Sequence, residues 1–329
     1  MRRYLPGLVI AAAVLAVAAG CLGAALALVY RDGPAREEIT LIVPKGATLR
    51  ATASLLGTHG VIRQPALFQA YARLAGASGA LKAGEYAFPP GTSMYDALAR
   101  LVAGDVVLRQ LTVPEGLSVN QVLTLLAEAP GLIGDPGEDV AEGSLLPETY
   151  HYTHGDDRRE LVRRMQAAMT ATLAELWESR AEGVPLASPA EALILASIVE
   201  KETGLAHERP LVAGVFVNRL RAGLPLQSDP TVAYVVSGGN GVLDRPLTRT
   251  DLGTESPYNT YRRRGLPPGP IANPGRAAIA AVLDPANTDA LYFVADGTGG
   301  HAFARDLESH NRNVRAWRRW QREQRQSAD

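Results

Sequence analysis

The sequence predicts an α+β protein with an N-terminal transmembrane helix, a small α/β module and a larger, mostly helical domain that contains a small sheet. Three observations support this fold class. An uncharged apolar run opens the chain, a strand–turn–helix motif then occurs three times, and the remainder alternates helical patterns with one glycine-rich hairpin.

Composition excludes several functional classes. The chain has 329 residues, 47% of them apolar, which is enough for two or three domains with a sizeable core. Its 33 basic and 34 acidic residues nearly cancel, which argues against a nucleic-acid-binding protein. Cys21 is the only cysteine, so an intrachain disulfide and a cysteine metal cluster are excluded. The six histidines form no His-Glu-x-x-His pair, and no metal or cofactor is predicted.

Residues 1–30 are predicted to be a short cytoplasmic N-terminus and a transmembrane helix. No charge occurs from Tyr4 to Tyr30. Residues 5–30 would span roughly 39 Å at about 1.5 Å per residue, enough to cross a bilayer. Arg2 and Arg3 precede the span, so the positive-inside rule places the body in the periplasm or extracytoplasmic space, outside the plasma (inner) membrane. A cleaved signal peptide and lipidation at Cys21 are the alternatives.

Residues 31–38 are charged and contain Gly33-Pro34, so we interpret them as a linker. The repeated motif follows at 43–49, 88–94 and 113–119, in the form apolar, Pro, any, Gly, any, Ser or Thr, apolar. Proline ends a strand, glycine turns the chain, and the hydroxyl group of Thr48, Ser93 or Ser118 caps the next helix. Shaping these turns is sufficient to explain the motif.

The central element is the apolar helix predicted from Ser188 to Thr203. Ser188 suits the N-cap, and Glu191 stands where a capping box has its second member. We expect Glu200 to emerge where the core opens into a cleft, and Glu202 to point away from that cleft. Desolvation would keep Glu200 protonated, as a general acid for glycosidic cleavage requires. A solvated helix edge is the alternative.

Further helices are predicted at 157–182, 210–221 and 306–326, and a hairpin at 291–303. The last helix is rich in arginine. A solvated face explains this pattern, and contact with anionic envelope polymers is the sharper alternative.

Several motifs carry a family resemblance in a consistent order. They are LASIVEKET (195–203), Asn-Arg-Leu (218–220), LQSDPTVAY (226–234), YNTY (258–261) and GLPPGPIANPG (265–275). Together they closely resemble the membrane-bound endolytic murein transglycosylases of the YceG-like family. The resemblance implies a LysM-like module at 39–107 and a catalytic domain at 108–325, with activity as a lytic transglycosylase. For the strand–turn–helix repeats it implies glycan binding, as an equal alternative to the shaping of turns.

The resemblance also implies site residues. Other lytic transglycosylases pair a catalytic glutamate with a downstream glutamine and a Tyr-Asn pair, which assigns catalysis to Glu200. The substrate-binding candidates are Gln227, Ser228, Asp229, Tyr258, Asn259, Tyr261 and Glu148. For Gln227 and Asn259, turn stabilisation is an equal alternative. Asp229 and Glu148 are also candidates for a second carboxylate, although a cap or turn role is favoured for both.

In this family the C6 hydroxyl of N-acetylmuramic acid attacks its own C1, so one carboxylate suffices and a 1,6-anhydro end results. The implied substrate is the β-1,4 bond between N-acetylmuramic acid and N-acetylglucosamine within peptidoglycan strands, with a role in terminating glycan elongation. A glycoside hydrolase with two carboxylates and a non-catalytic peptidoglycan-binding scaffold are the alternatives. Whether peptidoglycan synthases are partners stays open.

Overall fold

The structure is a computed structural model that describes residues 5–326. It divides into two compact units, which are described separately. Unit 1 contains the chain up to Arg109 together with His151–Asp156, and unit 2 contains Gln110–Tyr150 and the chain from Asp157 onward. Arg2 and Arg3, on which the predicted orientation depends, lie outside the described residues.

Unit 1 begins with the apolar helix α1 (Leu5–Tyr30). Within the described residues it is the one helix that is long and apolar enough to cross a membrane, with a mean hydropathy of 2.4 over Ala12–Tyr30. Membrane anchors and signal sequences share this property.

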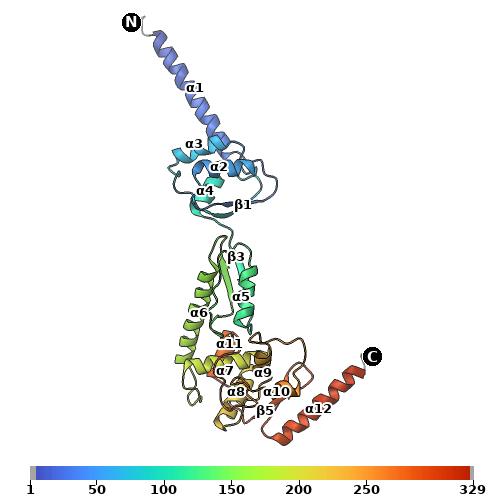
Figure 1. Ribbon diagram of the computed structural model, residues 1–329. Coiled ribbons are helices and arrows are strands. Elements are labelled where there is room, and N and C mark those ends of the chain that lie inside the picture. The colour runs from blue at the N-terminus through green and yellow to red at the C-terminus, as the bar shows by residue number, and fades with distance from the viewer. Residues whose placement is uncertain (1–4, 327–329) are drawn as a thin grey trace. The chain divides into compact units, whose positions relative to one another are not determined.

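The rest of unit 1 is a two-stranded sheet covered by short helices (Figure 1). Strand β1 (Ile39–Val43) pairs antiparallel with β2 (Gly84–Phe88). Helices α2 (Leu49–Thr58), α3 (Pro65–Leu74) and α4 (Met94–Ala103) surround the apolar core. Phe68, Tyr86 and Phe88 are fully buried in it, and each contributes roughly 1.5 to 3 kcal/mol by leaving water.

The three repeats form the predicted turns. The hydroxyl oxygens of Thr48, Ser93 and Ser118 accept hydrogen bonds from backbone amides three residues later and cap α2, α4 and α5 (Val119–Glu128). The glycine of each repeat has a positive φ, from 73° to 78°, which residues with a side chain rarely adopt. The first two copies belong to unit 1 and the third belongs to unit 2.

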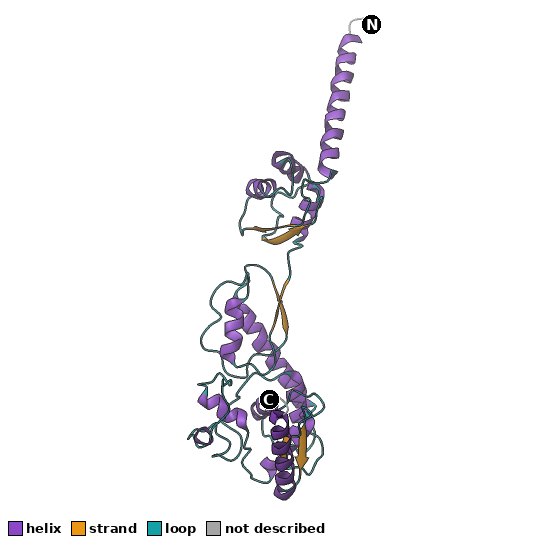
Figure 2. Ribbon diagram, turned by 90° about the vertical axis from the view of Figure 1, so that its right-hand side faces the viewer, coloured by secondary structure: helices purple, strands orange, loops and turns teal. Residues whose placement is uncertain are grey.

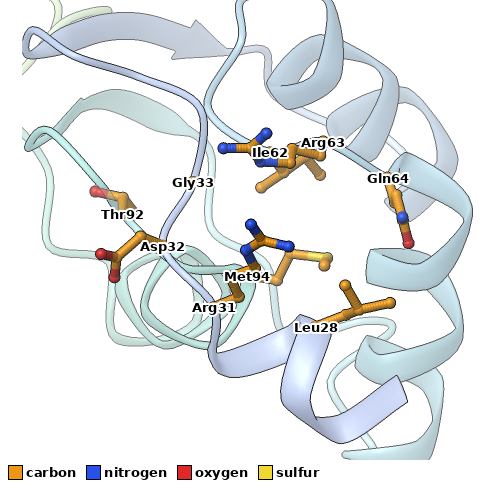
Figure 3. A pocket seen from close by; sticks show the side chains of 9 residues that line it. All are labelled: Leu28, Arg31, Asp32, Gly33, Ile62, Arg63, Gln64, Thr92 and Met94. Carbon is orange, nitrogen blue, oxygen red and sulfur yellow. The ribbon is translucent and has the colours of Figure 1, made fainter. Parts of the chain in front are cut away.

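The predicted linker packs closely on unit 1. The amide of Gly33 donates to the carbonyl of Gly91 at 3.1 Å. A Cβ atom on Gly33 would lie 2.3 Å from the carbonyl oxygen of Thr92, so only glycine fits there. Figure 3 shows the small pocket beside this turn, where Arg31 and Arg63 lie near apolar side chains. Residues 31–38 are therefore partly anchored.

Unit 2 is mostly helical, and its core lies where α6 (Arg158–Glu178), α7 (Pro189–Glu202), α8 (Arg209–Arg221) and α11 (Arg276–Leu283) pack together (Figure 1). Helix α7 is covered on most sides, as its sequence predicts. Its N-cap Ser188 accepts from the amide of Glu191 at 3.3 Å. The capping box does not close, because the Glu191 carboxylate accepts from Ala187 instead.

The remaining elements are short, apart from the C-terminal helix. Strands β3 (Arg109–Thr112) and β4 (Thr149–Tyr152) pair with each other, and helices α9 (Asp229–Val236) and α10 (Arg249–Leu252) follow α8. The predicted hairpin is present: β5 (Tyr292–Ala295) pairs antiparallel with β6 (His301–Ala304). Figure 2, with strands in orange, shows how little of the chain is sheet. Helix α12 (Leu307–Gln326) ends the described chain.

Candidate active site

A pocket of about 370 Å³ lies in unit 2 at the C-terminal end of α7. Its volume exceeds that of the pocket beside Gly33, about 20 Å³, and that of a pocket beside Pro285, about 150 Å³. Three of its lining residues, Gln227, Asp229 and Tyr261, were predicted as substrate contacts. The full lining is Glu202, Arg219, Leu226, Gln227, Asp229, Tyr261, Tyr292, Phe293, Leu307 and His310. Carboxyl, guanidinium and aromatic groups thus converge on one space, a lining suited to a polar ligand with apolar faces.

Glu202 and Asp229 are carboxylic acids that line this pocket, and Glu202 is the last residue of α7. Its Oε1 accepts a hydrogen bond of 2.5 Å from the hydroxyl of Ser228, the buried N-cap of α9. Burial raises the pKa of Glu202 to about 7; the Ser228 bond opposes this shift and the nearby Asp229 carboxylate adds to it. A glutamic acid with such a pKa holds a transferable proton near neutral pH, which general acid catalysis requires.

The segments around Ser228 and Thr260 are held together by a compact hydrogen-bond network. The amide of Gln227 donates to the carbonyl of Thr260 at 3.1 Å, and the amide of Ser228 donates to the Thr260 hydroxyl at 3.0 Å. The hydroxyl groups of Thr231 and Thr260 lie 2.9 Å apart. Thr260, which was not predicted as a site residue, therefore joins the motif at 226–234 to the motif at 258–261.

Gln227 has an unusual backbone conformation. It is the one residue other than glycine with a positive φ, 55°, within the described part of the chain. Such a conformation costs free energy and persists only when the surrounding structure enforces it. Here the contacts with Thr260 enforce it, and the Gln227 side chain is directed to the pocket, where Oε1 accepts from Arg219.

Tyr261 and Asp229 form a second polar pair in the pocket. The hydroxyl of Tyr261 donates to Oδ1 of Asp229 at 2.6 Å. Burial raises the pKa of Tyr261, and the hydrogen bond to Asp229 raises it further. The phenol therefore stays protonated across the neutral range and acts as a donor. Asp229 itself begins α9, immediately after the N-cap.

Glu200 occupies the opposite side of α7, and this corrects the expected geometry. Its side chain is only 5% exposed. Oε2 accepts from the amide of Gly275 at 2.9 Å, and Oε1 lies 3.7 Å from the guanidinium of Arg209, which also contacts Glu115. Burial is the largest effect on the pKa of Glu200 and raises it, and the nearby Glu115 carboxylate raises it further. The hydrogen bond from the Gly275 amide and the positive charge of Arg209 act in the opposite direction. Glu200 does not line the pocket and instead joins α7 to the start of α11.

Three other predicted contacts lie away from the pocket. Asn259 is fully buried; its amide donates to the carbonyls of Leu252 and Thr254, and its Oδ1 accepts from the amide of Tyr261. The ring of Tyr258 packs 5.3 Å from that of Tyr234. Glu148 is exposed at the start of β4. For Asn259 the turn-stabilising alternative explains every contact, since all its hydrogen-bonding groups are used within the loop.

Arg219 is a pocket residue that the sequence reasoning did not assign. It lies in the Asn-Arg-Leu motif on α8 and is 8% exposed, and its guanidinium lies 5.3 Å from the ring of Tyr292. A signal was available: arginine in an apolar helical stretch is rarely buried without a polar task. Tyr292 and Phe293 of β5 form an aromatic wall of the pocket, and they have no comparable signal in the sequence.

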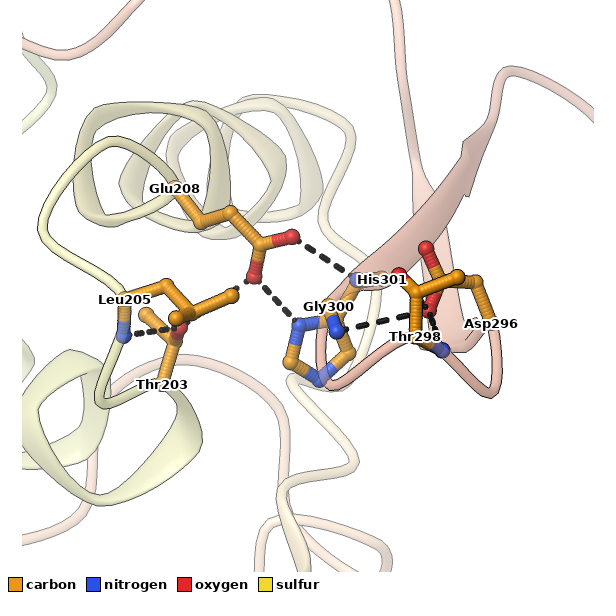
Figure 4. Close-up of polar contacts among 7 residues, drawn as sticks. All are labelled: Thr203, Leu205, Glu208, Asp296, Thr298, Gly300 and His301. Atoms are coloured by element: carbon orange, nitrogen blue, oxygen red, sulfur yellow. Dashed lines mark hydrogen bonds and ion pairs between the residues drawn. The ribbon is translucent and has the colours of Figure 1, made fainter.

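The hairpin that supplies this wall is held by Glu208, the N-cap residue of α8. Glu208 is 5% exposed and accepts from the amide of His301 at 2.8 Å and from its Nδ1 at 2.7 Å (Figure 4). The hydroxyl of Thr203, just after α7, donates to the same carboxylate at 3.2 Å. Burial raises the pKa of Glu208, but the hydrogen bonds from His301 and Thr203 outweigh burial and leave it below the usual range.

Taken together, these contacts place one glutamic acid with a raised pKa, Glu202, at a pocket lined by polar and aromatic groups. Comparisons with known proteins assign the chain to a family. The YceG-like family model matches residues 41–316. The chain therefore belongs to the YceG-like family.

Individual relatives carry more specific names. An endolytic murein transglycosylase of Bacillus subtilis (strain 168) is 31% identical over 308 residues, which cover 84% of each protein. One from Streptococcus pneumoniae (strain ATCC BAA-255 / R6) is 31% identical over 86% of this chain and 59% of that protein. A crystal structure of a yceG-like protein from Listeria monocytogenes superposes with a TM-score of 0.54 at 28% identity, over 84% of this chain and 99% of that one.

Proposed function

We propose that this protein is a membrane-anchored endolytic peptidoglycan lytic transglycosylase in which Glu202 is the catalytic acid and base. Relatives named endolytic murein transglycosylases support the reaction class. The observation that carries the choice of residue is the position of Glu202, which lies in the pocket with Gln227, Asp229 and Tyr261 and whose pKa is raised to about 7.

In the proposed reaction, Glu202 first donates a proton to the substrate and then accepts one from it. Protonated Glu202 gives its proton to the glycosidic oxygen between N-acetylmuramic acid and N-acetylglucosamine, and the bond from C1 to that oxygen breaks. The C6 hydroxyl of the muramic residue attacks C1 and closes the 1,6-anhydro ring, and its proton returns to the Glu202 carboxylate. Ser228, bonded to Oε1, orients the carboxyl group through both steps. Water is not consumed.

A hydrolase would need a second carboxylate about 5 to 9.5 Å from the first, serving as base or nucleophile. Asp229 is the candidate, because it lines the same pocket. Its Oδ1, however, is already occupied by the hydrogen bond from Tyr261. Glu148 does not line the pocket. The transglycosylase reaction uses the groups present without a second free carboxylate.

The remainder of the chain would bring this site to the cell wall. Helix α1 would anchor the protein in the plasma (inner) membrane, with Arg2 and Arg3 on the cytoplasmic side. The strand–turn–helix repeats of residues 39–107 would serve as a LysM-like, glycan-binding module. Cutting strands near the membrane would limit their growth and place the protein beside the enzymes that polymerise them.

Product analysis tests this proposal. The full-length protein in detergent is incubated with purified peptidoglycan strands, and the new ends are analysed by mass spectrometry. We expect 1,6-anhydro-N-acetylmuramic acid ends, each lighter by one water than a hydrolysis product, at internal positions in the strands. Reducing ends alone would establish hydrolysis through two carboxylates. No cleavage by a folded protein would leave the scaffold alternative.

A further inference from the structure

Arg219 is a buried cation whose contacts in the structure are all with neutral groups. Its side chain lies on α8, Nε donates to the carbonyl of Pro225 at 3.0 Å, and Nη2 donates to Oε1 of Gln227. The guanidinium carbon lies 5.3 Å from the centre of the Tyr292 ring. Among residues 5–326, the guanidinium contacts these three groups, and none of them is an acid.

A buried charge is costly unless an opposite charge or several hydrogen bonds compensate for it. Elsewhere in unit 2 the compensation is present: Arg209, at 13% exposure, lies within ion-pair distance of both Glu115 and Glu200. Arg219 is buried more deeply, at 8% exposure, and has no such partner among the described residues. Within residues 5–326, Nη1 makes no hydrogen bond to the protein, which leaves one edge of the guanidinium for a ligand in the pocket.

The other ionisable groups of the pocket do not neutralise Arg219. The carboxyl group of Glu202 accepts from Ser228, and that of Asp229 accepts from Tyr261. Within residues 5–326, neither carboxyl group forms an ion pair with Arg219. His310, stacked 5.1 Å from Tyr292, stays neutral because burial and the neighbouring Arg219 lower its pKa. Arg219 is therefore a cation at the pocket without an ion-pair partner among the described residues, beside the proposed catalytic acid.

We propose that Arg219 binds a carboxylate on the lactyl side of the N-acetylmuramic acid residue next to the cleaved bond. This inference rests on the proposed function, which brings a muramic residue into the pocket. The carboxylate would be the free lactyl group of a peptide-free residue, or a carboxylate of the peptide stem attached there. The planar fork of arginine suits such a group, since it can offer parallel N–H donors to both oxygens.

The test compares matched strands with and without negative charge. Full-length protein is assayed on native strands, on the same strands with every carboxyl group converted to a methylamide, and on peptide-stripped strands in both forms. We expect the wild-type kcat/KM to favour the charged form by about tenfold to hundredfold, the effect of a charge-assisted hydrogen bond. In Arg219→Gln the ratio should fall close to one, and Arg219→Lys should retain part of it.

Several readouts separate the outcomes. A preference seen on native strands alone assigns the stem carboxylate, and one that persists on stripped strands assigns the lactyl group. Arg221→Gln is the matched control, because Arg221 is exposed on the same helix and bonds only the carbonyl of Gly183. A wild type without preference, or an Arg219→Gln variant that keeps the ratio while both rates fall, would overturn the proposal.

Binding provides a version of the test that needs no turnover. Fluorescently labelled strands, charged or methylamidated, are titrated with the Glu202→Gln protein and with Glu202→Gln/Arg219→Lys. The affinity ratio should be large in the first and smaller in the second. Failure of the proposed function would appear as absent anhydro products, whereas failure of this proposal would appear as equal affinity for the two forms.

Discussion

The two sides of the last turn of α7 each carry a glutamic acid whose pKa is raised, yet their surroundings differ. On one side, the carboxylate of Glu200 is almost fully covered and meets fixed partners, the Gly275 amide and the Arg209 guanidinium. On the other, Glu202 has one hydrogen bond, from Ser228, and faces an open pocket. A raised pKa alone therefore does not identify a catalytic acid, and access for a substrate decides between the two.

The closed side has its own purpose. Glu200 accepts a hydrogen bond from the amide of Gly275, the N-cap residue of α11, where a carboxylate also interacts favourably with the positive end of the helix. A side chain at Gly275 would collide with Glu115, since its Cβ would lie 1.7 Å from Oε1. Nearby, the fully buried Asn273 donates to the carbonyl of Leu117 and accepts from the amide of Leu145. The contacts on this side therefore hold loops to the end of α7.

The largest effect is expected when Glu202→Gln and Glu200→Gln are compared with each other. Glu202→Gln removes the transferable proton, so cleavage should fall by roughly 10² to 10⁴ while the melting temperature is maintained or rises. Glu200→Gln should retain most activity but lose about 1 to 3 kcal/mol of unfolding free energy, because the buried Arg209 loses one of its two acidic partners. Rates on peptidoglycan strands and denaturant unfolding are measured for both.

The roles of the two residues could prove reversed. A Glu200→Gln protein that is stable but inactive, together with an active Glu202→Gln, would return catalysis to Glu200 as the sequence suggested. Glu191→Gln on the half-buried first turn of α7 serves as a control for general effects of removing an acid from this helix.

The pH dependence should separate the two sides next. Because the pKa of Glu202 is raised to about 7, its acid form predominates below that pH and is lost above it. We therefore expect kcat/KM to fall about tenfold per pH unit above neutral pH. Unfolding measured at each pH should show a second effect. The wild type should lose stability relative to Glu202→Gln as the pH rises from 4.5, the pKa of this group in the unfolded chain, through 7, because the folded state binds the proton more tightly. A flat profile would remove Glu202 as the acid.

Much of this arrangement was predictable from local rules. The repeats specify their turns and caps, because proline, glycine and a hydroxyl act on neighbouring backbone groups. Helix α7, its N-cap and the β5–β6 hairpin follow in the same way from periodicity and turn residues. The phase of α7 is also correct, since Glu200 and Glu202 do point in different directions.

What local rules could not supply is which side of α7 opens. Glu202 faces the pocket because Ser228 and Tyr261, far along the chain, are brought to that side by the contacts of Thr260. The Gly275 loop closes the other side through a similarly distant contact. The same limit explains Asn259, whose residue type suits a sugar and a turn equally well until its three backbone partners are known.

The smallest effect should come from the two tyrosines of the Tyr-Asn-Thr-Tyr segment, which the structure places differently. Tyr261→Phe removes the hydrogen bond of 2.6 Å to Asp229, so the pocket loses a fixed donor while the ring stays. We expect kcat/KM to fall by about threefold to tenfold, mainly through KM, as for a lost neutral hydrogen bond. Tyr258→Phe should change it less than twofold, because that ring packs against Tyr234 outside the pocket. Steady-state rates on strands of uniform length measure both, and a larger loss in Tyr258→Phe would show that the glycan extends over the Tyr234 side of unit 2.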